Sequence, residues 1–472
     1  MTKLNKDAEK LRKSLFYRRI NVWDKLQPEH VDAMESYSIE YRQYLDQSKT
    51  EREAVAVAQE AIMANGYEEL GKSKQKERLF VKHADKALAI FRKGKLDLSA
   101  GLNIVVAHVD SPRLDLKQNP LYEDTELVFL KTHYYGGIKK YQWLSRPLAI
   151  HGVVILPDGT SKSIIIGEDA DDPVFTIADL LPHLAGKAQG NKKAGEFITG
   201  EKLNIILGSR PFGNDPDLAE RFKLFAAQLL HERYGLREED FISADLEVVP
   251  SGCTREVGLD RSLIAGYGQD DRVCAYAALR SILEAEEIQR SALILLMDKE
   301  EIGSEGSTGS NTWFLEMVMG DILDLYGHQD YGTLRRILST AACLSADVNA
   351  AVHPDWAEVH EKRNAAYLNS GLVLSKFTGV RGKASSNEAH AEFLAKLRRI
   401  FGDNDIVWHI AELGKVDEGG GGTIAKFMAY YGMDVIDAGV PVLDMHSPFE
   451  ITAKTDIWMM KKAFMAFLQD YR

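Results

Sequence analysis

The segment from Leu293 to Ser304 constrains this chain most, because a run of apolar residues ends there in two adjacent glutamates. Leu293 to Met297 is unbroken apolar sequence, which is typical of a strand buried on both faces. Glu300 and Glu301 follow at the point where open α/β sheets place their chemistry. Neighbouring side chains diverge, so one glutamate can hold a metal while the other faces a water molecule. An isolated acidic pair is more often solvated surface charge, so this interpretation needs support from elsewhere in the chain.

Four further residues with metal-binding side chains stand at comparable positions. His108 and Asp347 each come just after an apolar run, and His446 follows the last predicted strand, residues 435–443. Asp270 opens a predicted helix, where a plain N-cap is the ordinary alternative. Because the carboxyl ends of the strands of such a sheet converge on one edge, we expect these residues to lie together. The expected set is His108, Asp270, Glu301, Asp347 and His446.

Two histidines and three carboxylates suit a pair of divalent cations that share one carboxylate. Each ion would hold one histidine and one terminal carboxylate, and the remaining aspartate would be shared. A mixed set of nitrogen and oxygen ligands favours zinc, with cobalt and manganese as alternatives. Glu300 is then free to act as a general base on a bridging water.

Composition excludes several classes of function. The chain has 472 residues and a net charge of −12, which argues against a nucleic-acid partner. No apolar run reaches membrane-spanning length, and the N-terminus lacks the apolar core of a signal peptide, so we expect a cytoplasmic protein without a membrane partner. Cys253, Cys274 and Cys343 are far apart and predict free, buried thiols in a reducing compartment.

The pattern predicts an α/β fold with a second domain inserted into the first. Helix-like and strand-like segments alternate in residues 1–112, including a long helix from about Ile39 to Asn65. Residues 113–244 instead carry short β-like runs, with a hairpin turn at Pro157–Gly159. The first domain resumes at 245 and continues to 472.

Two glycine-rich segments raise the alternative of a nucleotide-binding protein. Gly66 to Ser73 matches the phosphate-loop pattern letter for letter. That loop requires a strand before it and a helix after it, whereas here a predicted helix precedes it. Glu68 and Glu69 would also repel phosphate, so we do not expect binding there. The run Gly419 to Gly422 lets the backbone approach a ligand closely, or serves only a tight turn.

The order and wording of these motifs resemble the aspartyl aminopeptidase family of metallopeptidases over nearly the whole chain. The motifs are His-x-Asp-Ser-Pro-Arg from His108, Asp-Asp-Arg from Asp270, Asp-x-Glu-Glu-x-Gly-Ser from Asp298, Ser-Ala-Asp ending at Asp347, and Met-His-Ser around His446. The resemblance implies a three-layer αβα catalytic domain with a mixed central sheet. It also implies that the insertion serves dimerisation and that the subunits commonly form a tetrahedral dodecamer.

The resemblance assigns roles to individual residues. It implies that Asp270 bridges two ions, with His108 and Asp347 on one and Glu301 and His446 on the other. Asp110 would orient His108, and Glu300 would be the general acid and base. His183 follows a proline in an apolar setting, where a core histidine is the usual case, but the family presents this histidine to a neighbouring subunit's active site. Substrate contacts are expected from His353, Lys376, Gly420 and Gly421.

Departures from the family pattern fall around the substrate pocket. Ala350 stands where relatives often carry a second histidine, Asp271 replaces the usual asparagine, and the glycine loop is longer. These changes put the preference for acidic N-terminal residues in question.

We expect a cytoplasmic aminopeptidase with two zinc ions that acts on peptides. The alternatives are a carboxypeptidase or deacylase on the same scaffold, and a structural metal-binding shell, which would have no use for the free Glu300.

Overall fold

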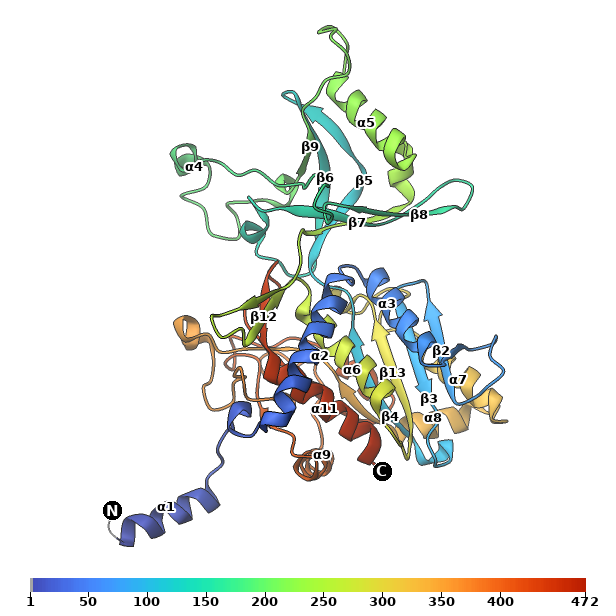
Figure 1. Cartoon of the computed structure of the whole chain (residues 1–472), viewed down its shortest axis with the longest axis vertical. Coiled ribbons are helices and arrows are strands. Elements are labelled where there is room, and N and C mark those ends of the chain that lie inside the picture. Colours follow the sequence, from blue (N-terminus) through green and yellow to red (C-terminus); the bar gives the residue numbers. More distant parts are fainter. Residues whose placement is uncertain (1–2) are drawn as a thin grey trace.

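The computed structural model of the chain describes residues 3–472 and has two bodies, a larger one below and a smaller one above in Figure 1. A nine-stranded mixed sheet forms the centre of the larger body. Its strands in spatial order are β1 (Glu68–Glu69), β2 (Arg78–His83), β3 (Ala87–Arg92), β13 (Ser291–Met297), β4 (Leu102–His108), β14 (Ala342–Ser345), β18 (Asp434–Gly439), β16 (Leu372–Ser375) and β17 (Trp408–Ile410).

The four central strands β13, β4, β14 and β18 run parallel to one another. Their carboxyl ends therefore share one edge of the sheet, as the sequence predicts. Both faces of these strands are buried, and successive side chains alternate between two hydrophobic clusters. Val105 of β4 packs in one cluster, whereas Ile104 and Val106 pack in the other.

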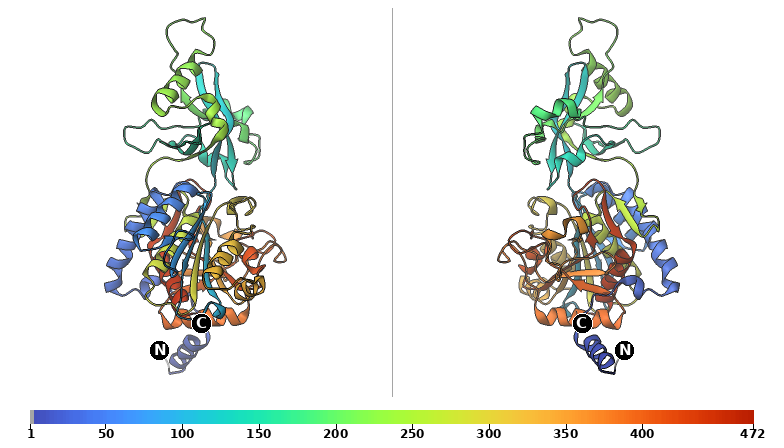
Figure 2. Two further views of the ribbon diagram at one scale, coloured as in Figure 1. Left: turned by 90° about the vertical axis from the view of Figure 1, so that its right-hand side faces the viewer. Right: turned by 90° about the vertical axis from the view of Figure 1, so that its left-hand side faces the viewer.

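Helices cover both faces of this sheet, which gives the expected three-layer arrangement (Figure 2). One layer contains α2 (Pro28–Asp46), α3 (Glu51–Ala64), α6 (Gln269–Glu284), α9 (Ala391–Asp403) and α11 (Lys454–Asp470). The other contains α7 (Phe314–Leu325), α8 (Tyr331–Ser339) and α10 (Ala425–Ala429). The remaining helix of this body, α1 (Lys3–Leu15), projects away from it (Figure 1).

The single long helix predicted over residues 39–65 is wrong, because the chain breaks between α2 and α3. Thr50 caps α3 by accepting the Glu53 N–H, and the Glu53 side chain accepts the Thr50 N–H in return. The phosphate-loop match at Gly66–Ser73 lies between α3 and β2, with β1 inside it. It therefore lacks the strand before and the helix after that phosphate binding requires.

The smaller body is built on a six-stranded antiparallel sheet. The strands in spatial order are β8 (Ser161–Ile166), β7 (Leu148–Ile155), β10 (Ala244–Pro250), β5 (Arg113–Asp124), β6 (Leu127–Tyr135) and β9 (Ile205–Gly208). Helix α5 (Arg221–Tyr234) packs against this sheet, and the short α4 (Pro182–Ala188) lies at its side (Figure 1). The β7–β8 hairpin turns at Pro157–Gly159 as predicted.

Strand β10 belongs to this smaller sheet, although the sequence analysis gave residues from 245 onward to the first domain. It pairs with β7 on one side and β5 on the other. Two small sheets follow in the larger body. They are β11 (Arg255–Val257), β12 (Leu263–Gly266) and β20 (Glu450–Ala453), and the pair β15 (Asn349–Ala350) and β19 (Pro441–Val442). Residues 435–443 are therefore split between β18 and β19, and β20 is a later strand that the sequence analysis did not foresee.

A buried ionic cluster joins the two bodies. Arg113 of β5 places Nε 3.1 Å from Glu247 Oε2 and Nη1 3.6 Å from Glu51 Oε2. Its guanidinium also lies 3.9 Å from the centre of the Tyr135 ring. One cation thus contacts two buried carboxylates from different elements, which ties the smaller sheet to α3.

None of the helices within residues 3–472 has the length and apolar character needed to cross a membrane. The cytoplasmic location stays a prediction. The three cysteines are free, and Cys274 and Cys343 are buried as predicted, but the prediction is wrong for Cys253, which is exposed.

Candidate metal centre

His108 and His446 both point the Nε2 atom of their imidazole ring at Asp270. His108 Nε2 lies 3.2 Å from Asp270 Oδ1, and His446 Nε2 lies 3.3 Å from Asp270 Oδ2. On the other side of each ring, Nδ1 faces a backbone carbonyl, at 3.0 Å for Asp110 and 2.8 Å for Gly137. A carbonyl can only accept, so Nδ1 carries a hydrogen in both rings. Each Nε2 can therefore face the carboxylate favourably only if it carries a second hydrogen or binds a cation that the carboxylate shares.

Further carboxylates surround Asp270. Two groups offer ligand atoms that all lie within 4.8 Å of one another, and Asp270 belongs to both. Glu301 Oε2 also lies 3.6 Å from His446 Nε2. The first group is His108, Asp270 and Glu301, and the second is Asp270, Asp271 and Asp347. The five residues that the sequence predicts as ligands are therefore gathered at one place, and Asp271 joins them.

The electrostatics of this cluster fit a divalent cation. Burial raises the pKa of Glu301 and Asp347 well above the usual range, and the charge of Asp270 adds to both shifts. Glu301 Oε1 and Asp271 Oδ1 are buried with no hydrogen-bond partner among the described residues. Although burial would lower it, the hydrogen bond to Asp270 and the charge of Glu301 raise the pKa of His446 to about 10. Imidazole nitrogens and carboxylate oxygens in this proportion suit zinc.

Asp110 holds the two strand ends together. Its Oδ1 accepts the backbone N–H of Glu300 at 3.1 Å, and its Oδ2 accepts that of Glu301 at 3.1 Å. The Tyr135 hydroxyl donates to Oδ2 at 2.7 Å. Asp110 Oδ1 also lies 3.3 Å from His108 Nδ1. This carboxylate therefore orients one predicted ligand from β4 and fixes the backbone that carries two glutamates after β13.

Glu450 plays the corresponding part on the opposite side of the cluster. Its Oε1 accepts the backbone N–H of His446 at 2.7 Å, and its Oε2 accepts that of Asp270 at 3.0 Å. Pairing of β12 with β20 places Glu450 opposite Gly266, directly before α6. Burial and the nearby charge of Asp270 raise the pKa of Glu450 to about 8. The sequence analysis missed this residue, although a lone acid four positions after His446 was a signal.

The smaller sheet also reaches the cluster, which the sequence analysis did not anticipate. Tyr135 ends β6, and the turn after it brings Gly136 and Gly137 against the predicted ligands. Gly136 has φ +72°, and a Cβ atom there would lie 3.4 Å from Glu301 Oε2. The Gly137 carbonyl is the partner of His446 Nδ1. A glycine pair directly after a strand of the insertion was the available signal.

A cavity of about 490 Å³ opens beside the cluster. Glu300 lines it, as do Gly420 and Gly421 of the glycine loop. Burial raises the pKa of Glu300 to about 7, and the negative charges of Asp110 and Asp270 add to that shift. The other predicted contacts lie elsewhere. Lys376 faces Glu388 at 3.7 Å, and His353 accepts the backbone N–H of Asp355.

His183 also lies outside this cavity. It stands on α4 of the smaller body and is exposed, so it is not the core histidine that its apolar neighbours suggest.

This arrangement is typical of metal-dependent hydrolases. Side chains that could hold a metal lie at the carboxyl edge of a set of parallel strands, and a further glutamate lines the adjoining cavity. The sequence profile of the family described as "Aminopeptidase I zinc metalloprotease (M18)" matches residues 44–468. A probable M18 family aminopeptidase 1 from Clostridium acetobutylicum is 46% identical over 457 residues, which cover 95% of this chain and 98% of the relative. The chain belongs to the M18 family of zinc aminopeptidases, which are metallo-exopeptidases.

Solved structures agree with this assignment. The M18 aminopeptidase from Thermotoga maritima has a TM-score of 0.92 and 45% identity, and the match covers 96% of this chain and all of that one. A structure described as an S. cerevisiae mApe1 dodecamer shares the fold, with a TM-score of 0.74 and 21% identity over 92% of this chain and 97% of that one. The family sets the chain among aminopeptidases, not among the carboxypeptidases or deacylases considered as alternatives.

We expect Glu450→Gln to weaken metal retention. An amide keeps one acceptor but turns its NH₂ group toward a backbone N–H, so either His446 or Asp270 loses its support. Loss of such an outer partner typically lowers metal affinity about 10- to 100-fold. Zinc content after dialysis against a graded series of chelator concentrations measures this. Glu256→Gln, in the same small sheet but bound to Lys454, is the matched control. Equal zinc retention in the two variants would show that Glu450 does not support the centre.

Proposed function

We propose that this chain removes N-terminal residues from peptides at a centre of two zinc ions that share Asp270. The observation that carries this proposal is that Asp270 presents a different carboxylate oxygen to each histidine. One ion would be held by His108 and Asp347, and the other by Glu301 and His446. Cobalt and manganese are the alternatives to zinc. When bound, the ions supply Lewis-acid polarisation of the scissile carbonyl and a lowered pKa for the attacking water.

Glu300 is the proposed general base. It lines the cavity, and its Oε2 lies 4.0 Å from His108 Nε2, so it stands beside the ligands without being needed as one. A pKa of about 7 suits a group that must take and return a proton near neutral pH. Glu300 accepts the proton of the attacking water and then delivers it to the leaving amine. Asp110 keeps Glu300 in place by accepting its backbone N–H.

Glu300→Gln is expected to keep its zinc and lose most of its turnover. The amide has the same size but cannot accept the proton, so kcat should fall by roughly 10² to 10⁴. Hydrolysis of an aminoacyl-anilide, measured together with zinc content, tests this. Glu305→Gln is the control, because Glu305 is exposed and its side chain bonds only Asn311 within residues 3–472. Near-full turnover by a zinc-loaded Glu300→Gln protein would refute the assignment.

The preference for acidic N-terminal residues stays a prediction. Lys376, expected near an acidic side chain, is paired with Glu388 outside the cavity. Lys426 does line the cavity and offers a cation to an acidic side chain. The buried carboxyl of Asp437 lines the same cavity, however, and would disfavour an acidic side chain there. A comparison of Asp-, Glu-, Leu- and Lys-anilides gives the order directly.

The smaller body is proposed to serve dimerisation and to present His183 to a neighbouring subunit. The insertion predicted as residues 113–244 extends through β10, to Pro250, if the whole six-stranded sheet is counted. Leu180, Leu181 and Leu184 are exposed around His183, which is consistent with a segment that contacts another subunit. The dodecamer of the yeast relative supports a closed homo-oligomer built from such dimers.

Subunit mixing tests the role of His183. If it acts in the neighbouring site, His183→Ala and Glu300→Gln oligomers are each weakly active, but dissociating and reassembling them together restores activity. In mixed oligomers an intact Glu300 site then receives an intact His183 from its neighbour. Each variant reassembled with itself is the control. If the activity of the mixed oligomers stays at the average of the activities of the two self-reassembled variants, His183 does not act in the neighbouring subunit's site.

A further inference from the structure

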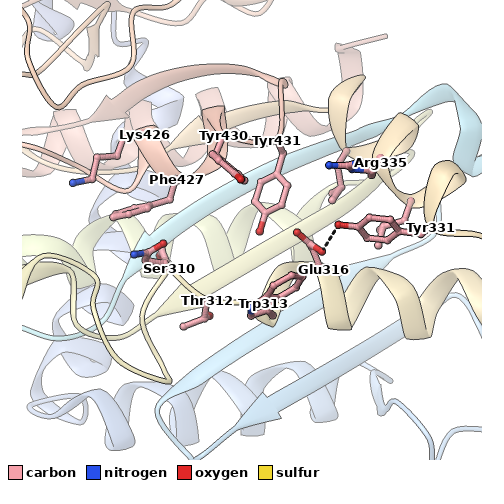
Figure 3. Close-up of a pocket in the computed structure, with 13 residues that line it drawn as sticks. Ser310, Thr312, Trp313, Glu316, Tyr331, Arg335, Lys426, Phe427, Tyr430 and Tyr431 are labelled. Carbon is pink, nitrogen blue, oxygen red and sulfur yellow. Dashed lines mark hydrogen bonds between the residues drawn. The ribbon is translucent and has the colours of Figure 1, made fainter.

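A second hollow, of about 740 Å³, adjoins the cavity of the metal centre. Lys426 and Phe427 at the start of α10 line both hollows, so the two hollows meet at these side chains. We call the second hollow the outer groove. Figure 3 shows Lys426 and Phe427 at one end of it and Tyr331 and Arg335 of α8 at the other.

The outer groove exposes aromatic side chains to an unusual degree. Trp313, just before α7, is 69% exposed, and Tyr430 is 87% exposed. Tyr331 and Tyr431 line the same hollow (Figure 3). Large aromatic side chains gathered on a surface commonly mark a binding site, because their burial by a ligand is favourable.

The outer groove has a cation at each end, Lys426 beside the metal cavity and Arg335 at the far end, with Glu316 between them. Glu316 is engaged, since the Tyr331 hydroxyl donates to its Oε2 at 3.1 Å. Arg335 lies 5.1 Å from the Tyr331 ring, and no carboxylate comes within 4.0 Å of it in the described part of the chain. The far end of the groove thus offers a guanidinium to an incoming anion, and guanidinium groups bind carboxylates well.

We infer that the outer groove binds the part of a peptide substrate that lies beyond the bond that is cut, with the peptide's terminal carboxylate at Arg335. This inference rests on the proposed function. An aminopeptidase holds only one residue on the amino side of the cut bond, so all the rest of the peptide must leave the metal cavity on one side. The outer groove continues that cavity past Lys426 and Phe427, and its aromatic walls and terminal cation match the chemistry of a short peptide acid.

A series of peptides of increasing length, each with a free or an amidated C-terminus, tests the inference against an aminoacyl-anilide that is too short to enter the groove. For peptides long enough to reach Arg335, Arg335→Met should raise KM for the free acids roughly fivefold. This is the change expected when one exposed ion pair is lost. The amides and the anilide should be unaffected, and kcat should not change. Arg336→Met is the matched control, because Arg336 is next in sequence but lies near Asp330 and does not line the groove. Equal KM values for the two variants at every length would overturn the inference.

Two further measurements separate the alternatives. Calorimetric titration of the Glu300→Gln protein with a tetrapeptide acid reports binding without turnover. If the wild type hydrolyses nothing but adding Arg335→Met still weakens this binding, the proposed function fails and the groove stands. Sedimentation velocity on Trp313→Ala and Tyr430→Ala detects a second copy as the occupant. Unchanged association with weaker peptide binding supports the inference, and a lower association state would overturn it by showing a subunit contact.

Discussion

The carboxylates buried around Asp270 can be ionised together only if positive charge lies among them. The contacts that surround this cluster depend on that constraint. The imidazole Nε2 atoms of His108 and His446 face this aspartate from opposite sides, each with its other nitrogen committed to a backbone carbonyl. The neighbouring glutamate and aspartate have raised pKa values for the same reason, namely burial beside like charges. Zinc, which the family description names, would remove this conflict if it were bound by these side chains in place of protons.

The fold supports this charge cluster from two sides. Asp110 accepts two successive N–H groups after β13, while Glu450 accepts the N–H groups of Asp270 and His446. Neither carboxylate needs to touch a metal to support the site. Asp110 ties the end of β4 to the segment after β13, and Glu450 ties the segment around His446 to the start of α6. The smaller sheet adds a third support through the Tyr135 hydroxyl and the Gly137 carbonyl. The insertion is therefore part of the centre as well as a separate body.

The sequence predicts the position of a candidate ligand well where that residue directly follows a buried apolar run. His108, Glu301 and Asp347 each follow a buried apolar run, and parallel pairing of β13, β4 and β14 brings them to one edge. Sequence reasoning failed where the contact is non-local. The last five residues of strand β10 are all buried, a pattern that does not tell the smaller sheet from the larger one, and only its pairing with β7 and β5 shows which sheet it joins. Glu450 and Tyr135 act through hydrogen bonds to distant backbone and carboxylate groups, which no spacing in the sequence reveals. Lys376 is a similar case, because its partner Glu388 comes from a loop.

Zinc anomalous scattering from crystals of the zinc-loaded protein shows whether two ions share Asp270. If they do, two peaks will lie one on each side of the Asp270 carboxylate, the first beside His108 and Asp347 and the second beside Glu301 and His446. A single fully occupied peak, or two peaks of which only one contacts Asp270, would contradict the sharing of Asp270.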